Sequence, residues 1–451
     1  MRKVITYGTY DFLHQGHINL LKRAKALGDY LIVGVTNDNF DRERGKLNVQ
    51  NNVLERVEAV KATGLADKII IEDYFGQKID DIQRYDIDVF AIGSDWVGKF
   101  DYLREYCEVV YLPRTEGVSS TMLRAAMQKV IKIGIVGAGR IAKRFIPESK
   151  YVSAVKVCGI YDIVRAHSEL LVGSNDDITI YDDYFTLLDS VDAVYIATPH
   201  LSHFDLAVEA LKRHKHVLIE TPMVLSDDQA KLLYDMADSN GVIAMEASKT
   251  AHCPAFSHLM SMIKSGVIGD VVDVEASLSK LMSDKSLREF DPNQAGGSMF
   301  ELASYPLLPI IKLFGCDYKD LRFCSLFDGG VDVFTKGTVL YSYGSASFKL
   351  GLGVKTEGNL VISGTKGYAY VPAPWWKTDY FELRYEDQNL NKKFFYKWDE
   401  SGLRYEIQEF ISCIVNHRFS TSRLRRRESV AIAGIMKAFR ERNNVTEIML
   451  Q

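Results

Sequence analysis

Two histidines, His14 and His17, follow the first β-like run of the chain and flank Gly16. The glycine lets a phosphate approach the backbone, and the free amides and positive dipole end of the helix that starts here stabilise its charge. The histidines can donate hydrogen bonds to non-bridging phosphate oxygens. Attack of a substrate phosphate on the α-phosphorus of a nucleoside triphosphate needs such positioning and charge stabilisation, and no protein nucleophile. The spacing therefore indicates nucleotidyl transfer; the alternative is a structural pair of histidines at a turn.

A second motif, Gly137-Ala138-Gly139-Arg140-Ile141-Ala142, follows a β-branched run and opens another helix. Glycines at this spacing let a dinucleotide pyrophosphate approach the helix N-terminus. Asp162 ends the next expected strand, where its carboxylate can accept both ribose hydroxyls and repel a 2′-phosphate. The motif predicts a bound dinucleotide, NAD(H) rather than NADP(H), although Arg165 nearby keeps the second open.

The elements that must position these residues alternate between strands and helices in two successive parallel-sheet systems. The first has strands at 4–6, 30–35, 68–71 and 89–92 and helices at 18–27, 52–63 and 79–85. The second starts at 130–136 and persists to about 242, after a helix-like stretch at 119–128 and without a Pro-, Gly- or Ser-rich linker. Strands at 271–276, 337–348 and 359–371 follow, and helices at 403–416 and 428–440 close the chain. We expect an α/β chain of three domains.

These domains are a small doubly wound domain at 1–127, a Rossmann domain at 130–250 and an α+β domain at 251–451 with an open-faced, mostly antiparallel sheet. The length of 451 residues fits about three domains. The 55 basic and 59 acidic residues give a net charge of −4, which provides no broad cationic field and excludes a nucleic-acid binder. Anionic ligands must therefore be held by local sites.

The N-terminus enters a β-like run directly, and no apolar run long enough to span a membrane follows. We therefore expect a cytoplasmic protein without a membrane partner. The six cysteines show neither a C-x-x-C pair nor metal-like spacing, so we expect reduced, mostly buried thiols.

Further strings accompany the histidine motif: Tyr7-Gly8-Thr9-Tyr10-Asp11, Gly93-Ser94-Asp95-Trp96 and the run from Tyr111 to Thr121. With them, residues 1–127 resemble the glycerol-3-phosphate cytidylyltransferase family of H-x-G-H nucleotidyltransferases. The resemblance implies CTP as substrate with Mg²⁺ as counter-ion, and catalytic roles for His14, His17, Lys46 and Arg114. The nucleotide-binding residues that it implies are Gly8, Thr9, Tyr10, Asp11, Gly16, Arg56, Asp95, Ser119, Ser120 and Thr121.

Several of these roles have alternatives. The loop 41–48 is shifted relative to the family pattern, so Arg44 can substitute for Lys46. Asp11 and Asp95 face either the metal or the acceptor, or else make structural hydrogen bonds, and we assign no metal ligand. Arg56 is either a nucleotide contact or a solvated charge on its helix.

Two strings after the glycine motif, Ala197-Thr198-Pro199-His200-Leu201-Ser202-His203 and Val217-Leu218-Ile219-Glu220-Thr221-Pro222, make residues 130–451 resemble the glucose-fructose oxidoreductase and inositol dehydrogenase family. The resemblance implies a Rossmann domain followed by an open-sheet substrate domain. The cofactor-binding residues we predict are Gly137, Gly139, Arg140, Ile141, Asp162, Thr198, Pro199, His200, His203, Glu220 and Thr221.

One departure from this family affects the chemistry, because Thr221 stands where the family commonly has a catalytic lysine. Carbonyl reduction needs a hydride and a proton donor for the nascent alkoxide. We expect Lys249 to restore the positive charge and Tyr305 to donate the proton, with Lys249 lowering its pKa. Glu301 would orient this pair, and His252 is a weaker candidate. The alternatives are an exposed Lys249 and a packing role for Tyr305.

Two catalytic signatures on one chain suggest consecutive steps. The favoured interpretation is a bifunctional enzyme that transfers a cytidylyl group from CTP to a polyol or ketose phosphate, releases pyrophosphate and reduces a carbonyl with NAD(P)H. Its product would be a CDP-polyol for a cell-wall or capsular polymer, with either order of steps. The alternative is a cytidylyltransferase fused to a non-catalytic NAD-binding module that regulates or oligomerises it. The resemblances also imply a homo-oligomer whose partners are small sugar or polyol phosphates.

Overall fold

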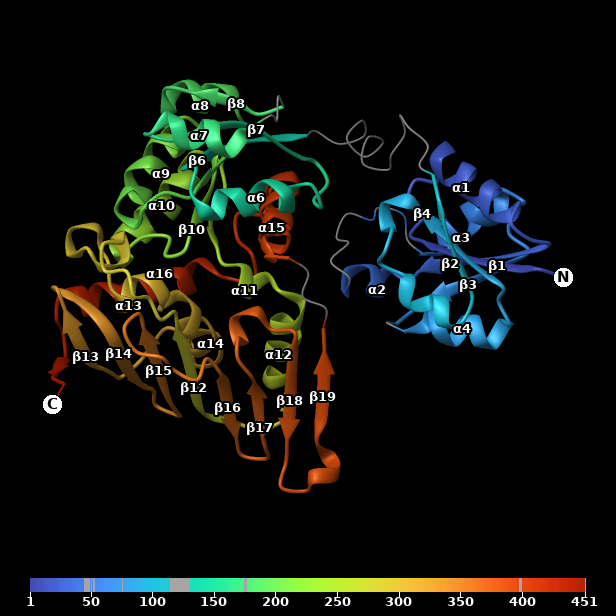
Figure 1. Cartoon of the computed structure of the whole chain (residues 1–451). Helices are drawn as coiled ribbons and strands as arrows, with labels where there is room; N and C mark the ends of the chain where they lie inside the picture. The colour runs from blue at the N-terminus through green and yellow to red at the C-terminus, as the bar shows by residue number, and fades with distance from the viewer. Residues whose placement is uncertain are drawn as a thin grey trace. The chain divides into compact units, whose positions relative to one another are not determined.

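The structure is a computed structural model that describes residues 1–451 except 44–48, 50, 52, 75, 114–129, 174–176, 397–399 and 451. It divides into two compact units (Figure 1). The first unit is Met1–Val130 with Tyr151–Ala154, and the second is Ile131–Lys150 with Val155–Gln451. Within the described ranges, no helix has the length and apolar character needed to cross a membrane. The domain boundaries at 127 and 250 stay predictions.

The first unit is built around a five-stranded parallel sheet in the order β3-β2-β1-β4-β5. Its strands are β1 (Lys3–Gly8), β2 (Tyr30–Thr36), β3 (Lys68–Glu72), β4 (Val89–Gly93) and β5 (Glu108–Leu112). Its helices are α1 (Gln15–Lys25), α2 (Asp38–Glu43), α3 (Val53–Ala62) and α4 (Gln77–Tyr85), with short 3-10 turns η1 (Ser94–Trp96) and η2 (Asp101–Glu105).

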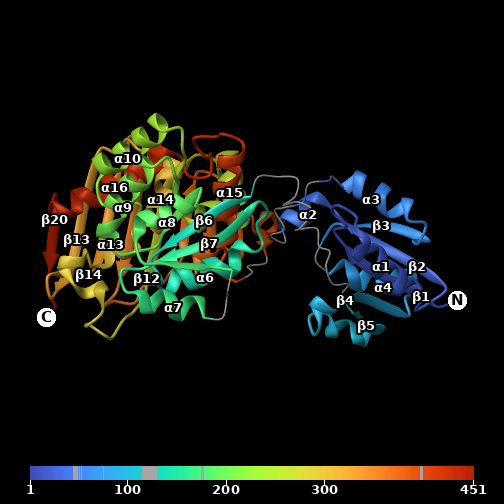
Figure 2. The ribbon, with the colours of Figure 1, turned by 90° about the horizontal axis from the view of Figure 1, so that it is seen from above.

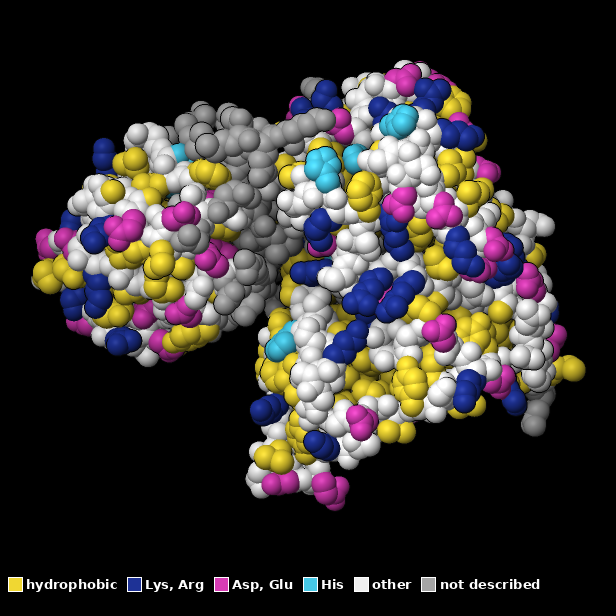
Figure 3. Space-filling view, turned by 180° about the vertical axis from the view of Figure 1, so that it is seen from behind, with side chains coloured by type: hydrophobic (Ala, Val, Ile, Leu, Met, Phe, Trp, Pro, Cys, Tyr) yellow, Lys and Arg dark blue, Asp and Glu magenta, His cyan; other side chains and the backbone are white. Residues whose placement is uncertain are grey.

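Both faces of this sheet are buried, as the apolar composition of β1 requires. Because successive side chains of a strand point to opposite faces, Val4 packs in one core with Leu21 of α1, while Ile5 packs in the other with Ile82 of α4. The prediction of a small doubly wound domain is confirmed. On the face in Figure 3, Lys and Arg side chains are interspersed with Asp and Glu over this unit.

The second unit begins with a six-stranded parallel sheet in the order β11-β10-β9-β6-β7-β8. Its strands are β6 (Ile131–Val136), β7 (Val155–Tyr161), β8 (Thr179–Tyr181), β9 (Ala193–Ile196), β10 (His216–Glu220) and β11 (Ala244–Ala247). Its helices are α6 (Arg140–Ser149), α7 (Arg165–Val172), α8 (Tyr184–Ser190), α9 (His203–Lys212) and α10 (Asp227–Ser239). Figure 2 shows α9 and α10 on one side of the sheet and α6 and α7 on the other.

The strand order reverses direction between β6 and β9, which are neighbours in the sheet. A crevice opens at such a point, outside the carboxyl ends of the strands, and open α/β sheets bind their ligands there. The glycine motif after β6 and the residues after β9 and β10 therefore meet at one edge of the sheet.

The rest of the second unit forms a nine-stranded sheet in the order β19-β18-β17-β16-β12-β15-β14-β13-β20. Its strands are β12 (Val271–Ser279), β13 (Asp320–Asp328), β14 (Val331–Leu340), β15 (Ser345–Gly351), β16 (Leu360–Gly364), β17 (Tyr368–Val371), β18 (Tyr380–Arg384), β19 (Lys392–Phe395) and β20 (Val445–Ile448). Its helices are α11 (Lys249–His252), α12 (Pro254–Lys264), α13 (Ser298–Leu302), α14 (Ser304–Phe314), α15 (Leu403–Val415) and α16 (Arg426–Arg440).

One face of this sheet carries the core, in which Phe348 of β15 packs with residues of α12, α14 and α16. Figure 1 shows α14 and α16 along that face. Buried and exposed residues alternate along β14, as expected for a sheet with one solvated face. The sheet is mixed, since β12 and β15 are parallel, as are β13 and β20, and the other pairs are antiparallel.

Two details of the sequence prediction are wrong. The runs 337–348 and 359–371 are not single strands, because turns that contain Gly344 and Gly367 fold each into a hairpin, β14–β15 and β16–β17. All six cysteines are free thiols, but only Cys253 and Cys413 are buried. The helix expected at 119–128 lies outside the described residues.

Candidate active sites

The histidine motif lies at the carboxyl end of β1, where the chain turns into α1. His14 is the N-cap of α1, and its Nδ1 accepts a hydrogen bond from the Gly16 amide at 3.1 Å. An accepting Nδ1 carries no proton, so the neutral ring has its proton on Nε2, and this is the ring nitrogen that can donate to a phosphate. The rings of His14 and His17 stack with centroids 3.9 Å apart. Two imidazoles thus lie together at a helix N-terminus, the site that favours an anion.

The residues before the motif fix its geometry. Tyr10 is buried and meets the ring of His17 edge-on, with centroids 5.5 Å apart. A Cβ at Gly8 would lie 2.9 Å from the Tyr10 ring, so a larger residue there would have to displace this buried ring. Asp11, also buried, accepts the Asn51 amide at 3.0 Å and so holds the segment before α3.

The glycine motif of the second unit lies at the crevice between β6 and β9. Gly137 has φ +97°, and a Cβ there would lie 2.7 Å from the carbonyl oxygen of Ala197. Gly139 is the N-cap of α6. Asp162, just after β7, accepts the Ala138 amide at 2.7 Å and therefore faces the glycine loop. The free amides of α6 suit a pyrophosphate and Asp162 suits a ribose, so these residues fit a dinucleotide.

The buried His203 contacts both the loop that follows β9 and the loop that follows β10. The ring nitrogens of His203 lie 2.8 Å from the carbonyl oxygen of Thr198 and 3.0 Å from that of Pro222. The predicted contact of His203 with the cofactor is thus replaced by a structural role, since both ring nitrogens face backbone carbonyls. His203 positions Thr198 and Thr221 at the crevice instead.

A charged cluster lies where β10 and β11 end. Glu220 pairs in register with Ala247, two residues before Lys249, so the two side chains come from neighbouring strand ends. Tyr195 donates its hydroxyl to Glu220. Lys249 is only 9% exposed, which excludes the alternative of an exposed lysine. Burial lowers the pKa of Lys249 against the opposing effect of Glu406 and Glu220, and burial raises the pKa of Glu220.

Two family models match the chain. Residues 5–126 match "Cytidylyltransferase-like", and residues 131–248 match "Oxidoreductase family, NAD-binding Rossmann fold". The glycerol-3-phosphate cytidylyltransferase of Bacillus spizizenii is 51% identical over 127 residues, which cover 28% of this chain and 98% of the relative. The chain joins a cytidylyltransferase domain to an oxidoreductase domain.

Relatives of the oxidoreductase domain are more distant. The scyllo-inositol 2-dehydrogenase (NADP(+)) of Bacillus subtilis is 25% identical over 328 residues, 70% of this chain and 98% of the relative. A 3-ketoreductase from Actinomadura kijaniata has a TM-score of 0.64 at 20% identity and matches 71% of this chain and 100% of its own. The latter likeness shows the fold.

Five residues predicted for the cytidylyltransferase site lie outside the described residues: Lys46, Arg114, Ser119, Ser120 and Thr121. Asp95 is exposed in η1 directly after β4, which neighbours β1, and so lies at the same sheet edge as the histidines. Among the residues that the structure describes, no cluster of three or more His, Cys, Asp or Glu side chains suits a metal.

Arg56 does not face a nucleotide, and this prediction is wrong. Its guanidinium is buried and donates to the carbonyl oxygens of Thr9, Thr36 and Asn51 at 2.7, 2.8 and 2.9 Å. It also pairs with Asp41 at 3.3 Å. A buried guanidinium needs such partners for its donors, and Arg56 uses them to tie the ends of β1 and β2 to α3.

The predicted proton-donor pair of the oxidoreductase domain also needs correction. Burial raises the pKa of Tyr305, Glu220 and Glu406 raise it further, and a hydrogen bond with Thr221 opposes them. The expected lowering of this pKa by Lys249 is therefore wrong, because burial and two carboxyl groups dominate. Tyr305 is a weak acid in this site.

Glu301 and His252 do not have their expected roles. Glu301 lies on α13 and pairs with Arg288 at 2.8 Å, so it holds that side chain rather than Tyr305 and Lys249. Burial lowers the pKa of His252 to about 3. An imidazole that is neutral near pH 7 holds no second proton to give, and this removes His252 as an acid.

The geometry of the glycine motif predicts a contrast between two matched substitutions. Gly137→Ala should destabilise the oxidoreductase domain by about 1–3 kcal/mol, since alanine is strained at positive φ and meets the Ala197 carbonyl. Gly139→Ala is the control, because its φ is −81° and no atom lies within 4 Å of an added Cβ. Thermal unfolding of the full chain, followed through the transition that NAD(P)H shifts, should show the loss only for Gly137→Ala. Equal unfolding midpoints for the Gly137→Ala and Gly139→Ala variants would contradict this prediction.

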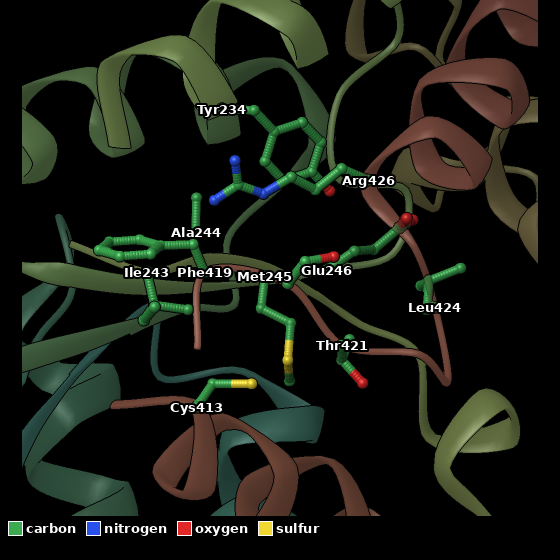
Figure 4. A pocket seen from close by; sticks show the side chains of 11 residues that line it. Tyr234, Ile243, Ala244, Met245, Glu246, Cys413, Phe419, Thr421, Leu424 and Arg426 are labelled. Carbon is green, nitrogen blue, oxygen red and sulfur yellow. The ribbon is translucent and has the colours of Figure 1, made fainter. Parts of the chain in front are cut away.

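A small pocket lies at the edge strand β11, lined among others by Tyr234, Glu246 and Arg426 (Figure 4). The Arg426 guanidinium lies over the Tyr234 ring, 5.1 Å from its centroid. The Met223 amide donates to Glu246 at 3.2 Å. The pocket volume of about 10 Å³ admits about one water molecule, so this is no substrate site.

One charged residue beside Lys249 and Glu220, Glu406 on α15, is not among the residues that the sequence predicts. It is fully buried and interacts electrostatically with Lys249 and Glu220. Nothing in the local sequence signals this, because its partners are distant in the chain.

Proposed function

We propose that the chain is a bifunctional enzyme that makes a CDP-polyol. It transfers the cytidylyl group of CTP to a polyol or ketose phosphate and reduces a ketose carbonyl with NAD(P)H. The observation that carries this proposal is the buried Lys249, which follows β11 beside the end of β10 that leads to Thr221, because it supplies the charge that Thr221 lacks. The first domain's relative is named for a polyol phosphate, glycerol 3-phosphate, which supports this acceptor class.

In the transfer step, an oxygen of the acceptor phosphate attacks the α-phosphorus of CTP. The bond from this phosphorus to the bridging oxygen breaks, and pyrophosphate leaves. We assign His14 and His17 as donors to the phosphate oxygens, at the N-terminus of α1. Mg²⁺ neutralises phosphate charge when bound. Lys46, Arg114, Ser119, Ser120 and Thr121 are proposed for the triphosphate, and Gly8, Thr9, Tyr10, Asp11, Gly16 and Asp95 for the remaining contacts.

In the reduction step, the carbonyl carbon would receive a hydride, which is the chemistry that a dinucleotide held by the glycine motif and Asp162 would supply when bound. The oxygen then takes a proton, and we assign Lys249 as the donor. Its lowered pKa makes the ammonium a better acid than a solvated lysine. Tyr305, whose pKa is raised, keeps its proton and donates a hydrogen bond to the substrate oxygen.

We propose NAD(H) as the preferred dinucleotide. Asp162 faces the glycine loop, where its charge repels a 2′-phosphate. Arg165, the cationic side chain near Asp162, already pairs with Glu169 at 2.8 Å and with Asp182. We assign Gly137, Gly139, Arg140 and Ile141 to the pyrophosphate, and Thr198, Pro199, His200, Glu220 and Thr221 to the nicotinamide end.

The chemistry of the product suggests its use. A CDP-activated polyol can donate a polyol phosphate to a growing chain, so we propose a role in a cell-wall or capsular polymer. CTP and reduced dinucleotide are cytoplasmic metabolites, so we place the enzyme in the cytoplasm. By analogy with its families we propose a homo-oligomer.

The test uses the purified chain with CTP, Mg²⁺ and a panel of ketose and polyol phosphates, with and without NADH or NADPH. We expect a CDP-ketose or CDP-polyol by mass spectrometry, and a product heavier by two hydrogens when a ketose and reduced cofactor are present together. Cytidylyl transfer without oxidation of either cofactor on any ketose would support the alternative, a non-catalytic NAD-binding module. Absence of every CDP product would overturn the proposal.

A further inference from the structure

A buried carboxyl group without a hydrogen-bonding partner lies beside the reductase site. Glu406 of α15 has no exposed surface, and in the described part of the chain neither of its carboxyl oxygens has a hydrogen-bonding partner. Buried carboxyl groups are normally hydrogen-bonded or paired, since burial of an unpaired charge is strongly unfavourable. An acid at such a place requires an explanation from its surroundings.

The surroundings hold α15 in a fixed position relative to the cofactor helix. Arg404 donates to Glu148 of α6 at 2.8 Å, and the Ser401 amide donates to the other oxygen of Glu148 at 2.9 Å. Both Arg404 and Glu148 are buried. α15 also packs against α11, which begins with Lys249. Glu406, two residues after Arg404, is therefore anchored between the cofactor helix and the lysine.

The charged groups that influence Glu406 and Lys249 come from several elements of the second unit. Lys249 interacts with Glu406, with Glu220 of β10, with Lys377 of the 3-10 turn η6 (Trp375–Lys377) and with Arg144 of α6. Glu148 also has an electrostatic effect on Glu406, although Arg404 already forms an ion pair with Glu148. Burial and Glu220 raise the pKa of Glu406. Two carboxyl groups thus share one lysine, and Tyr195 donates a hydrogen bond to one of them, Glu220.

We propose that Glu406 is a positioning residue for carbonyl reduction: its carboxyl group is the reserve counter-charge that keeps the buried Lys249 ammonium protonated. This inference rests on the proposed role of Lys249. As the pH rises, Glu406 loses its proton and the new negative charge favours the charged lysine.

The first test is the pH profile of kcat/KM for reduction. A proton donor works while it is protonated, so the rate falls as the pH rises through the pKa of Lys249. Glu406→Gln removes the counter-charge, which lowers that pKa, and we expect the alkaline limb to move to lower pH by about one unit or more. Glu406→Asp keeps the charge and should keep a limb near that of the wild type.

The matched control is Glu409→Gln on the same helix. Glu409 pairs with Arg418 at 3.3 Å and lies outside the cluster, so its removal should leave the limb unchanged. Thermal unfolding of the oxidoreductase domain, followed on the same samples through the transition that NAD(P)H shifts, reports whether each variant is folded. If Glu406→Gln does not fold, Glu406→Met, which has a similar length and no charge, should give the same shift. An unshifted limb in a folded variant overturns the inference.

A second readout does not depend on turnover. Acetylation of Lys249 by acetic anhydride requires the neutral amine, so its rate against pH, measured by mass spectrometry of the peptide, gives the lysine pKa. We expect a lower midpoint in Glu406→Gln than in wild type. A shifted midpoint in a chain that reduces no ketose would keep the inference and refute the proposed reductase; an identical midpoint would refute the inference alone.

Discussion

Replacing His14 with alanine is expected to lower the rate of CDP-product formation by about 10²- to 10³-fold and to leave NAD(P)H-dependent reduction unchanged. The reason is the tautomer that the helix cap imposes: Nδ1 accepts the Gly16 amide, which leaves the Nε2 proton for a phosphate oxygen of the transition state. Donors aimed at developing charge contribute more than ground-state contacts. Mass spectrometry for the CDP product and NADH absorbance for reduction measure both reactions on one sample.

The control must separate the imidazole from the cap, since alanine removes both. Loss of an N-cap destabilises a helix by about 1 kcal/mol, and asparagine is among the best caps. His14→Asn should therefore restore the thermal stability of the cytidylyltransferase domain without restoring transfer. Recovery of transfer in His14→Asn would mean that the cap alone matters. Equal loss of reduction and transfer would contradict two separate sites.

The sequence predicted those parts of the fold that depend on local pattern. Val4 and Ile5 lie in two different cores because successive side chains of a strand point to opposite faces of the sheet. A continuous apolar run predicts such a strand, buried on both faces. The glycine at 137 was identifiable because the motif spacing requires a close backbone approach, and its φ of +97° confirms the need for glycine. Such features follow from a few consecutive residues.

The errors arose where a side chain's role depends on distant segments. Arg56 had the position of a nucleotide ligand, yet its acceptors on Thr9 and Thr36 come from two other strand ends. Glu301 lies four residues before Tyr305, but α13 ends and α14 begins between them, so the two do not share one helix face. The Glu301 carboxylate forms an ion pair with Arg288 instead. Glu406 had no local signal. A pKa such as that of Tyr305 sums burial and charges from several elements, so no spacing rule gives its direction.

Replacing Lys249 with methionine is expected to lower kcat for carbonyl reduction by about 10²- to 10⁴-fold, while cytidylyl transfer continues at the wild-type rate. Methionine fills a similar volume without a proton to give. The neighbouring carboxyl groups of Glu220 and Glu406 can remain protonated when the ammonium is gone, since burial already raises their pKa values. The alkaline limb of the pH profile should also disappear, because the group that titrates there has been removed.

Two further variants decide which side chain gives the proton. Lys249→Arg keeps the positive charge, but a guanidinium holds its proton throughout the working pH range; we therefore expect it to be nearly as slow as the methionine variant. Tyr305→Phe removes one hydrogen bond, worth about 0.5–1.5 kcal/mol and so at most about 10-fold in rate. A fast Lys249→Arg would reduce the lysine to a fixed charge. A Tyr305→Phe variant as slow as Lys249→Met would return the proton to the tyrosine, against the direction in which burial, Glu220 and Glu406 move its pKa.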